Sequence, residues 1–207
     1  MKRFLLVLIC LLPCLVMGDE LTDAFESGDY ATAVKRLTEL AEQGQALAQI
    51  HLGALYLVGQ GVPEDVKQAL FWFRKAADQG NPTAQFTMGT MYYAGHGVQR
   101  DYQQAADWYH KAADQNFAGA QFTLGGMYAN GEGMPRDYKQ AVFWYRKAAE
   151  QGDPDAQFYL GCMFYYGQGV AQDYKQALDW YLKAADQGYA QGQNRIGGVG
   201  RACSEVP

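Results

Sequence analysis

Three histidines are the residues of this sequence most readily assigned to metal binding or acid–base catalysis. They are His51, His96 and His110. A metal site on a helix needs a second ligand at a fixed helical spacing, and none of the three has one nearby. No serine or threonine recurs together with a histidine and a carboxylate, as a nucleophilic triad requires. The sequence therefore predicts no metal, no cofactor and no catalytic residue.

Pairs of glycines are a second candidate for chemistry, because glycine-rich loops can hold phosphate groups. Each pair follows a helical pattern rather than a strand, and no third glycine opens the next helix at the spacing of a dinucleotide site. We interpret the pairs as turns: Gly59 with Gly61, Gly95 with Gly97, Gly131 with Gly133, and Gly167 with Gly169.

Recurring aspartates and tryptophans suggest a row of catalytic carboxylates and a ladder for stacking sugars. Each aspartate, however, precedes an apolar stripe and has Gln or, once, Thr three residues later, which is typical of a helix N-cap. Burying one tryptophan stabilises by roughly 5 kcal/mol, so packing explains the ladder. The residues are Asp29, Asp65, Asp101, Asp137 and Asp173, with Trp72, Trp108, Trp144 and Trp180.

A repeat positions all of these residues, since the tryptophans follow one another every 36 residues without insertion or deletion. A fixed period between about 20 and 50 residues is typical of a solenoid. In one unit, Asn81 and Pro82 begin a first helix (helix A), which ends at Gly95. A second helix (helix B) follows Asp101. We predict an all-α solenoid of antiparallel helix pairs that works through a surface rather than one pocket.

The period divides the chain into segments. The four full repeats are residues 46–81, 82–117, 118–153 and 154–189, and residues 19–45 form an N-terminal partial repeat in which Arg36 replaces the tryptophan. Residues 190–207 form a degenerate C-terminal tail, because Gly192, Gly198 and Gly200 argue against a full helix.

Residues 1–18 have the layout of a secretory signal peptide, with Lys2 and Arg3 before an uncharged run from Phe4 to Met17. Cleavage is expected between Gly18 and Asp19. A membrane anchor is the rival interpretation, but the run is shorter than the roughly 20 residues that span a bilayer. We therefore expect an exported protein, periplasmic or secreted, without stable membrane insertion after cleavage.

Cleavage leaves 17 − 2 = 15 basic and 22 acidic residues, a net charge of −7. This balance argues against nucleic acid or an anionic membrane as partner. Cleavage also removes Cys10 and Cys14, which leaves Cys162 and Cys203 in an oxidising setting. A disulfide between those two is one hypothesis, and two unpaired thiols are the other.

The segment AQFTLGGMYANGEGMPRDYKQAVFWYRKAAEQG, from Ala120 to Gly152, resembles the consensus of the Sel-1-like repeat, a relative of the tetratricopeptide repeat. The resemblance covers residues of about 20 to 197 and implies a right-handed α/α solenoid that acts as an adaptor for proteins. A cysteine-rich branch of the family is linked to penicillin binding and β-lactamase activity. In this sequence only one repeat has a cysteine at the position that this branch uses, Cys162, so that branch is a poor match.

The same resemblance implies that helix A lines the concave side, where a partner would bind. Some helix A positions change character between repeats while their neighbours do not, as expected of a variable binding surface; free drift of exposed positions explains the pattern equally well. The predicted contacts are His51, Val58, Thr87, Thr123, Asn130, Tyr159, Tyr165 and Tyr166.

The sequence thus predicts a non-enzymatic scaffold of the bacterial cell envelope or secreted space, with a protein or peptide partner. An enzyme acting on β-lactams and a self-associating structural envelope protein are the alternatives.

Overall fold

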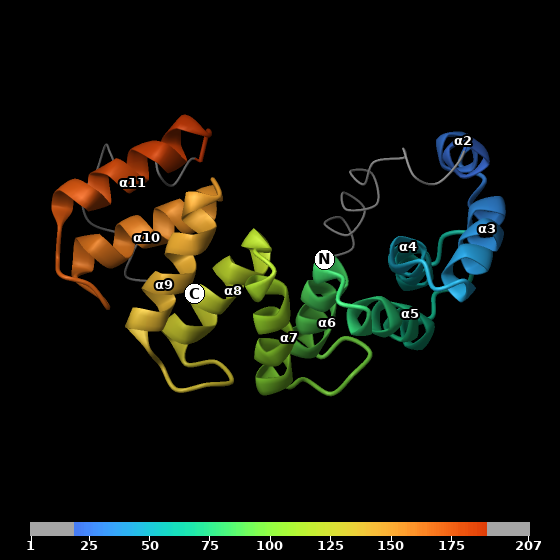
Figure 1. The fold of residues 1–207 in the computed structure, drawn as a ribbon, viewed down its shortest axis with the longest axis horizontal. Coiled ribbons are helices and arrows are strands. Elements are labelled where there is room, and N and C mark those ends of the chain that lie inside the picture. The colour runs from blue at the N-terminus through green and yellow to red at the C-terminus, as the bar shows by residue number, and fades with distance from the viewer. Residues whose placement is uncertain (1–18, 190–207) are drawn as a thin grey trace. The chain divides into compact units, whose positions relative to one another are not determined.

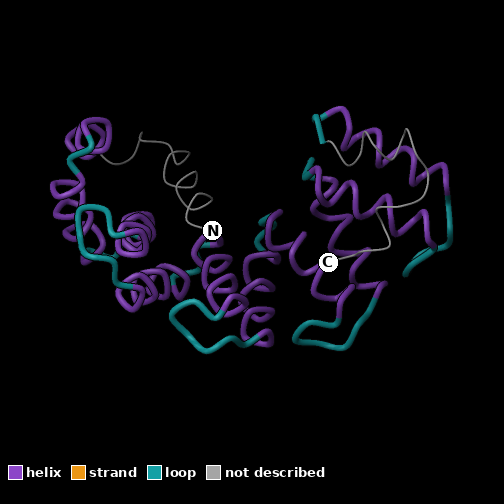
Figure 2. The backbone as a smooth tube through the Cα atoms, turned by 180° about the vertical axis from the view of Figure 1, so that it is seen from behind, coloured by secondary structure: helices purple, strands orange, loops and turns teal. Residues whose placement is uncertain are grey.

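The computed structural model describes residues 19–189, and within this range the chain consists of α-helices joined by turns, without a strand (Figures 1 and 2). This described part divides after Arg100 into two compact units. The first contains α2 (Asp19–Ser27), α3 (Tyr30–Glu42), α4 (Ala46–Val58), α5 (Val66–Asp78) and α6 (Pro82–Ala94). The second contains α7 (Tyr102–Asp114), α8 (Ala118–Asn130), α9 (Tyr138–Glu150), α10 (Pro154–Tyr166) and α11 (Tyr174–Asp186).

Within each unit, successive helices pack against one another. In the first unit α3 packs on α4, α4 on α5 and α5 on α6; in the second, α7 packs on α8, and the contacts continue through α9 and α10 to α11. Even-numbered helices from α4 onward are the predicted helix A, and the odd-numbered ones from α3 are helix B. The expected alternation of helices is confirmed, and the second repeat places its helix A and helix B in different units.

The predicted helix boundaries follow from capping side chains. The carboxylate of Asp137 accepts hydrogen bonds from the backbone N–H groups of Lys139 and Gln140, at 2.8 and 3.1 Å. Asn81 caps α6 in the same way through the N–H of Ala84. At the other end of α10, Gly167 adopts the left-handed conformation, with φ of 66°. The recurring aspartates are therefore N-caps, as predicted.

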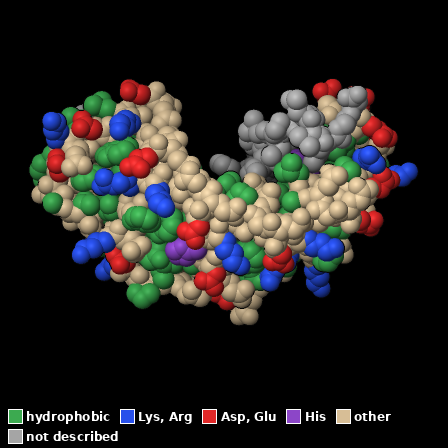
Figure 3. All heavy atoms as spheres, viewed as in Figure 1, with side chains coloured by type: hydrophobic (Ala, Val, Ile, Leu, Met, Phe, Trp, Pro, Cys, Tyr) green, Lys and Arg blue, Asp and Glu red, His purple; other side chains and the backbone are tan. Residues whose placement is uncertain are grey.

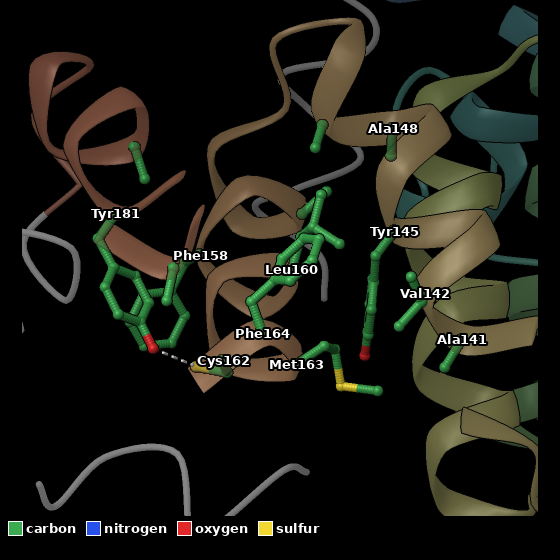
Figure 4. Close-up of a cluster of buried hydrophobic side chains, with 14 of the residues drawn as sticks. Ala141, Val142, Tyr145, Ala148, Phe158, Leu160, Cys162, Met163, Phe164 and Tyr181 are labelled. Carbon is green, nitrogen blue, oxygen red and sulfur yellow. Dashed lines mark hydrogen bonds between the residues drawn. The ribbon is translucent and has the colours of Figure 1, made fainter. Parts of the chain in front are cut away.

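The core lies between helix A and helix B and is built from the recurring apolar positions. Trp72, Trp108 and Trp144 are only 5–7% exposed, which confirms their predicted place in the core, whereas Trp180 on the last described helix is half-buried. In Figure 4, Val142 and Tyr145 of α9 point toward Leu160 and Met163 of α10.

Buried glutamines connect each helix A to the helix B before it. Their side-chain amides donate hydrogen bonds to a backbone carbonyl eight residues earlier, in the last turn of that helix. Each of these carbonyls also accepts a backbone N–H from the turn after the helix, so the glutamine supplies a second donor. The pairs are Gln49 with Ala41, Gln85 with Ala77, Gln121 with Ala113, and Gln157 with Ala149.

The second glycine of a loop lies against the start of the preceding helix B. A Cβ atom added to Gly133 would meet the backbone carbonyl of Tyr102 at 2.5 Å. Gly61 lies as closely to Tyr30, and Gly169 to Tyr138. Only a residue without a side chain fits between these two backbone segments.

Candidate functional site

The predicted partner contacts lie on helix A of several repeats, and most of them are partly exposed. Val58 and Thr87 belong to the first unit; Thr123, Asn130, Tyr159, Tyr165 and Tyr166 belong to the second. Thr87 and Thr123 donate their hydroxyl hydrogens to Thr83 and Gly119 one turn earlier in their own helices, both at 2.8 Å. The two threonines therefore offer a partner mainly a methyl group and an acceptor oxygen.

His51 does not lie on the surface, so its predicted exposure is wrong. The side chain is 5% exposed, and its ring lies 6.3 Å from the ring of Phe25 in α2. Burial lowers the pKa of His51, because it disfavours the charged form of the ring. Projection of a single helix could not reveal this, because the helix that covers His51 is the shortened α2, which does not follow the period.

Tyr159 is the centre of an aromatic cluster rather than a freely exposed anchor. Its ring stacks on that of Tyr145, with 5.7 Å between centroids and 16° between planes. Phe122 and Phe158 lie 5.7 and 5.5 Å from it. Burial, together with the negative charge of Asp155, raises the pKa of Tyr159. Only part of this side chain is available to a partner.

Three tyrosines of the second unit form a more accessible group, which we call the tyrosine edge. Tyr165 and Tyr166 end α10, and Tyr174 begins α11. The ring of Tyr165 is edge-on to those of Tyr166 and Tyr174, at 4.9 and 5.2 Å. Tyr166 is 37% exposed and Tyr174 60% exposed. On the face drawn in Figure 3, hydrophobic side chains of α10 and α11 lie exposed among charged ones.

Sequence reasoning missed Tyr174. Tyr138 and Tyr102 occupy the same phase of the period and are half-buried, because Gly169 and Gly133 of the next loops lie against their backbones. The position of Tyr174 in the last full repeat could have revealed its exposure. The loop glycine that would lie against it, as Gly169 lies against Tyr138, would fall in the predicted degenerate tail.

His110, in the second unit, contacts both a tyrosine hydroxyl and a tryptophan ring. Its Nε2 lies 3.2 Å from the hydroxyl oxygen of Tyr128, and its ring is edge-on to Trp144 at 5.5 Å. Burial lowers the pKa of His110, and Asp114 and Asp107 partly oppose the shift. Among residues 19–189, no group of three or more His, Cys, Asp or Glu side chains is arranged to hold a metal ion.

Cys162 is buried in the core between α10 and α11, where its sulfur accepts a hydrogen bond from the hydroxyl of Tyr181 at 3.4 Å (Figure 4). Cys203, the partner predicted from the sequence, lies outside the described residues, so the pairing stays a prediction. The same holds for the signal peptide and for Gly18 at its predicted cleavage site. No helix in the described range is long and apolar enough to cross a membrane.

Comparison with known proteins gives four consecutive matches to the Sel1 repeat, at residues 46–81, 82–117, 118–153 and 154–189. A solved structure of a protective antigen present in uropathogenic Escherichia coli strains is 42% identical, with a TM-score of 0.79 over 81% of this chain. A Sel1 repeat protein from Oxalobacter formigenes is 38% identical, with a TM-score of 0.76 over 80% of this chain. No curated protein sequence matches.

Both structures extend well beyond the matched region. The match covers 36% of the Escherichia coli antigen and 48% of the Oxalobacter protein, so this chain corresponds to less than half of either. Cysteine-rich protein B of Helicobacter pylori is more distant, at 26% identity and a TM-score of 0.51 over 63% of this chain. The described helices and these matches together establish an all-α solenoid.

Proposed function

Because the chain belongs to the Sel1 repeat family, we propose that it is a non-enzymatic scaffold that binds a protein or peptide through the helix A surface and tyrosine edge of its second unit. The tyrosine edge carries this proposal. Tyrosine combines a large apolar ring with a polar hydroxyl and is enriched among the residues that dominate binding energy at protein interfaces. Tyr165 contacts the rings of both Tyr166 and Tyr174, and this packing pre-organises the three rings as an anchor.

The composition of the neighbouring surface supports a protein partner. Asn130 and Thr123 on α8 are polar and partly exposed, and the half-buried Phe122 of the same helix packs against Tyr159, so the surface mixes apolar rings with hydrogen-bonding groups. Such a mixture is typical of non-obligate protein interfaces. The acidic balance of the chain does not favour nucleic acid.

A site-specific crosslink tests the proposal. Tyr166 is replaced by a photoreactive phenylalanine analogue, and the protein is irradiated in its native host. Phe143 on α9 is the matched control, because it is 47% exposed in the same unit but lies on helix B. We expect an adduct with one particular protein from position 166 and none from position 143. Equal adducts from both positions, or none from either, would contradict the proposed surface.

The location in the envelope or secreted space is also a proposal, supported by the basic and then apolar layout of residues 1–18. We expect the protein recovered from the periplasm or the medium to begin at Asp19. Recovery of the uncleaved chain from the cytosol would contradict export.

A non-enzymatic role is supported by the absence of recurring catalytic groups in the sequence and by cysteine positions unlike those of the cysteine-rich branch. Ala54, Thr90 and Gly126 occupy the places where that branch would repeat Cys162. Hydrolysis of a chromogenic β-lactam by the purified protein, faster than in a sample without the protein, would overturn this part of the proposal.

A further inference from the structure

An uncovered apolar stripe runs along α11. It consists of Tyr174, Leu178 and Leu182, which lie four residues apart and therefore on one face of the helix. They are 60%, 46% and 41% exposed, and thus account for half of the large hydrophobic residues exposed among residues 19–189. Isolated exposed apolar residues are ordinary, but a contiguous row of them marks an interaction site.

Comparison with α9 shows what this face does elsewhere in the second unit. Val142, the equivalent of Leu178, is 6% exposed, and Trp144, the equivalent of Trp180, is 5% exposed. Helix α10 packs on α9, and Val142 belongs to the same buried cluster as the apolar side chains of α10. The stripe on α11 is therefore a surface built to receive another helix.

The charges beside the stripe indicate which helix that is. Lys175 and Asp179 follow Tyr174 and Leu178 directly, so they form a row along one flank, and both are exposed. Lys175 and Asp179 lie two residues before and two residues after Ala177. If two α11 helices pack antiparallel with the two-fold axis level with Ala177, Lys175 of each copy faces Asp179 of the other. The stripe side chains of the two copies then alternate along the line of contact between the helices. An isologous contact of this kind is self-complementary.

We propose that the chain forms a two-fold symmetric dimer through the α11 stripe. The occupant of the stripe is α11 of a second copy, in antiparallel orientation. A single helix pair buries less surface than the roughly 1,200 Å² of a stable interface, so the dimer is a low-affinity one. The stripe shares Tyr174 with the tyrosine edge, but Leu178 and Leu182 lie outside that edge, so a change at Leu178 tests the dimer separately from the proposed partner surface.

Sedimentation velocity of the mature chain, from about 1 to about 300 μM, tests the dimer in the concentration range of weak association. We expect the mass to rise from one chain to two. Leu178→Glu should weaken dimerisation at least about tenfold, because it places a charge in the apolar seam. Phe143→Glu is the matched control, with the same exposure on α9, and should leave the dimer intact. Far-UV circular dichroism verifies that both variants are folded.

A charge exchange tests the antiparallel register without altering the apolar residues. Lys175→Glu and Asp179→Lys, made separately, should each weaken the dimer, and the double variant should restore it. A chain ending at Tyr189 should still dimerise. If the mature chain stays monomeric at all concentrations, the proposal is overturned. If in that case the truncated chain dimerises, residues 190–207 are the occupant of the stripe instead of a second copy. A dimer unaffected by Leu178→Glu would equally overturn the proposal.

Discussion

The side chain of Gln151 donates a hydrogen bond to the side-chain oxygen of Gln121 at 2.6 Å, across thirty residues of sequence. Gln121 in turn donates to the carbonyl of Ala113 at 3.1 Å, and to the side-chain oxygen of Asn116 at the same distance. One fully buried amide thus joins α7, α8 and α9. Gln79 with Gln49, and Gln187 with Gln157, repeat the contact.

Replacing Gln121 by leucine should lower the free energy of unfolding by about 2 kcal/mol, because the carbonyl of Ala113 and the side chains of Asn116 and Gln151 each lose a hydrogen-bond partner in a buried or partly buried place. Urea unfolding followed by circular dichroism measures the change. Gln140→Leu is the control, since Gln140 is exposed on α9 and should change stability by less than about 0.5 kcal/mol. Equal effects at both positions would mean that the amide network contributes nothing.

Two adjacent glycines of α8 should respond in opposite directions to alanine. A Cβ on Gly125 would lie 2.5 Å from the ring of Tyr145, whereas a Cβ on Gly126 would meet only the hydroxyl of that residue at 3.7 Å. Gly125→Ala should therefore destabilise by about 1–3 kcal/mol through overpacking. Gly126→Ala should stabilise by up to about 1 kcal/mol through helix propensity. Thermal unfolding of the two variants checks the signs.

The two tyrosines of α10 first expected to act together in binding should separate in their effects on stability. Tyr159→Ala removes a ring packed against Tyr145, Phe122 and Phe158 and should cost about 2–3 kcal/mol. Tyr166→Ala should change stability by less than about 0.5 kcal/mol, because Tyr166 is 37% exposed. Chemical denaturation distinguishes the two. Comparable losses would move Tyr166 into the core and remove it from the proposed binding surface.

Stability should fall as the pH falls below about 6.5. Burial lowers the pKa of His51 in the folded chain from its ordinary value of 6.5, so below that pH the unfolded chain binds a proton that the folded chain does not. The full stability is present above 6.5 and declines toward the lower folded pKa, by at most about 1.4 kcal/mol per pH unit for this group. His110 contributes in the same direction.

Unfolding of His51→Leu between about pH 5 and 7.5 isolates this contribution, because the variant cannot titrate at that position. The pH dependence should become shallower than in the native chain. Leu52→Met, a volume-conserving change at a buried position of the same helix that removes no titrating group, is the control and should leave the slope unchanged. An unchanged slope in His51→Leu would assign the pH dependence to other groups.

Features that recur every period could be predicted from the sequence, since each copy adds to the same signal. The N-caps at Asp101 and Asp137 and the buried Trp144 are examples. Features that depend on the ends of the array could not. His51 is covered by the irregular α2, and Tyr174 is exposed although its periodic equivalents are not. In both cases a neighbour in space, rather than a neighbour in the sequence, decides the burial.

The candidate site stays a prediction, made from helix A positions that vary between copies while the packed face does not. The stacking of Tyr159 on Tyr145 was not predictable, since it depends on the angle at which α9 meets α10. The glutamine bonds were also missed, although the sequence carries them: Gln49, Gln85, Gln121 and Gln157 are a polar residue repeated on a buried face. A polar side chain that recurs in a core implies a fixed partner.

Gly133 lies directly against the backbone of Tyr102, and Gly169 against that of Tyr138. These close approaches limit how the array of repeats can change in length. One residue added to or removed from a loop would shift the glycine along the backbone and bring a side chain into a space that holds none. Substitutions on the outer helix faces carry no such penalty. Viable length variants of this array should therefore differ by whole 36-residue modules, so that copy number, rather than loop length, is the parameter along which it can grow or shrink.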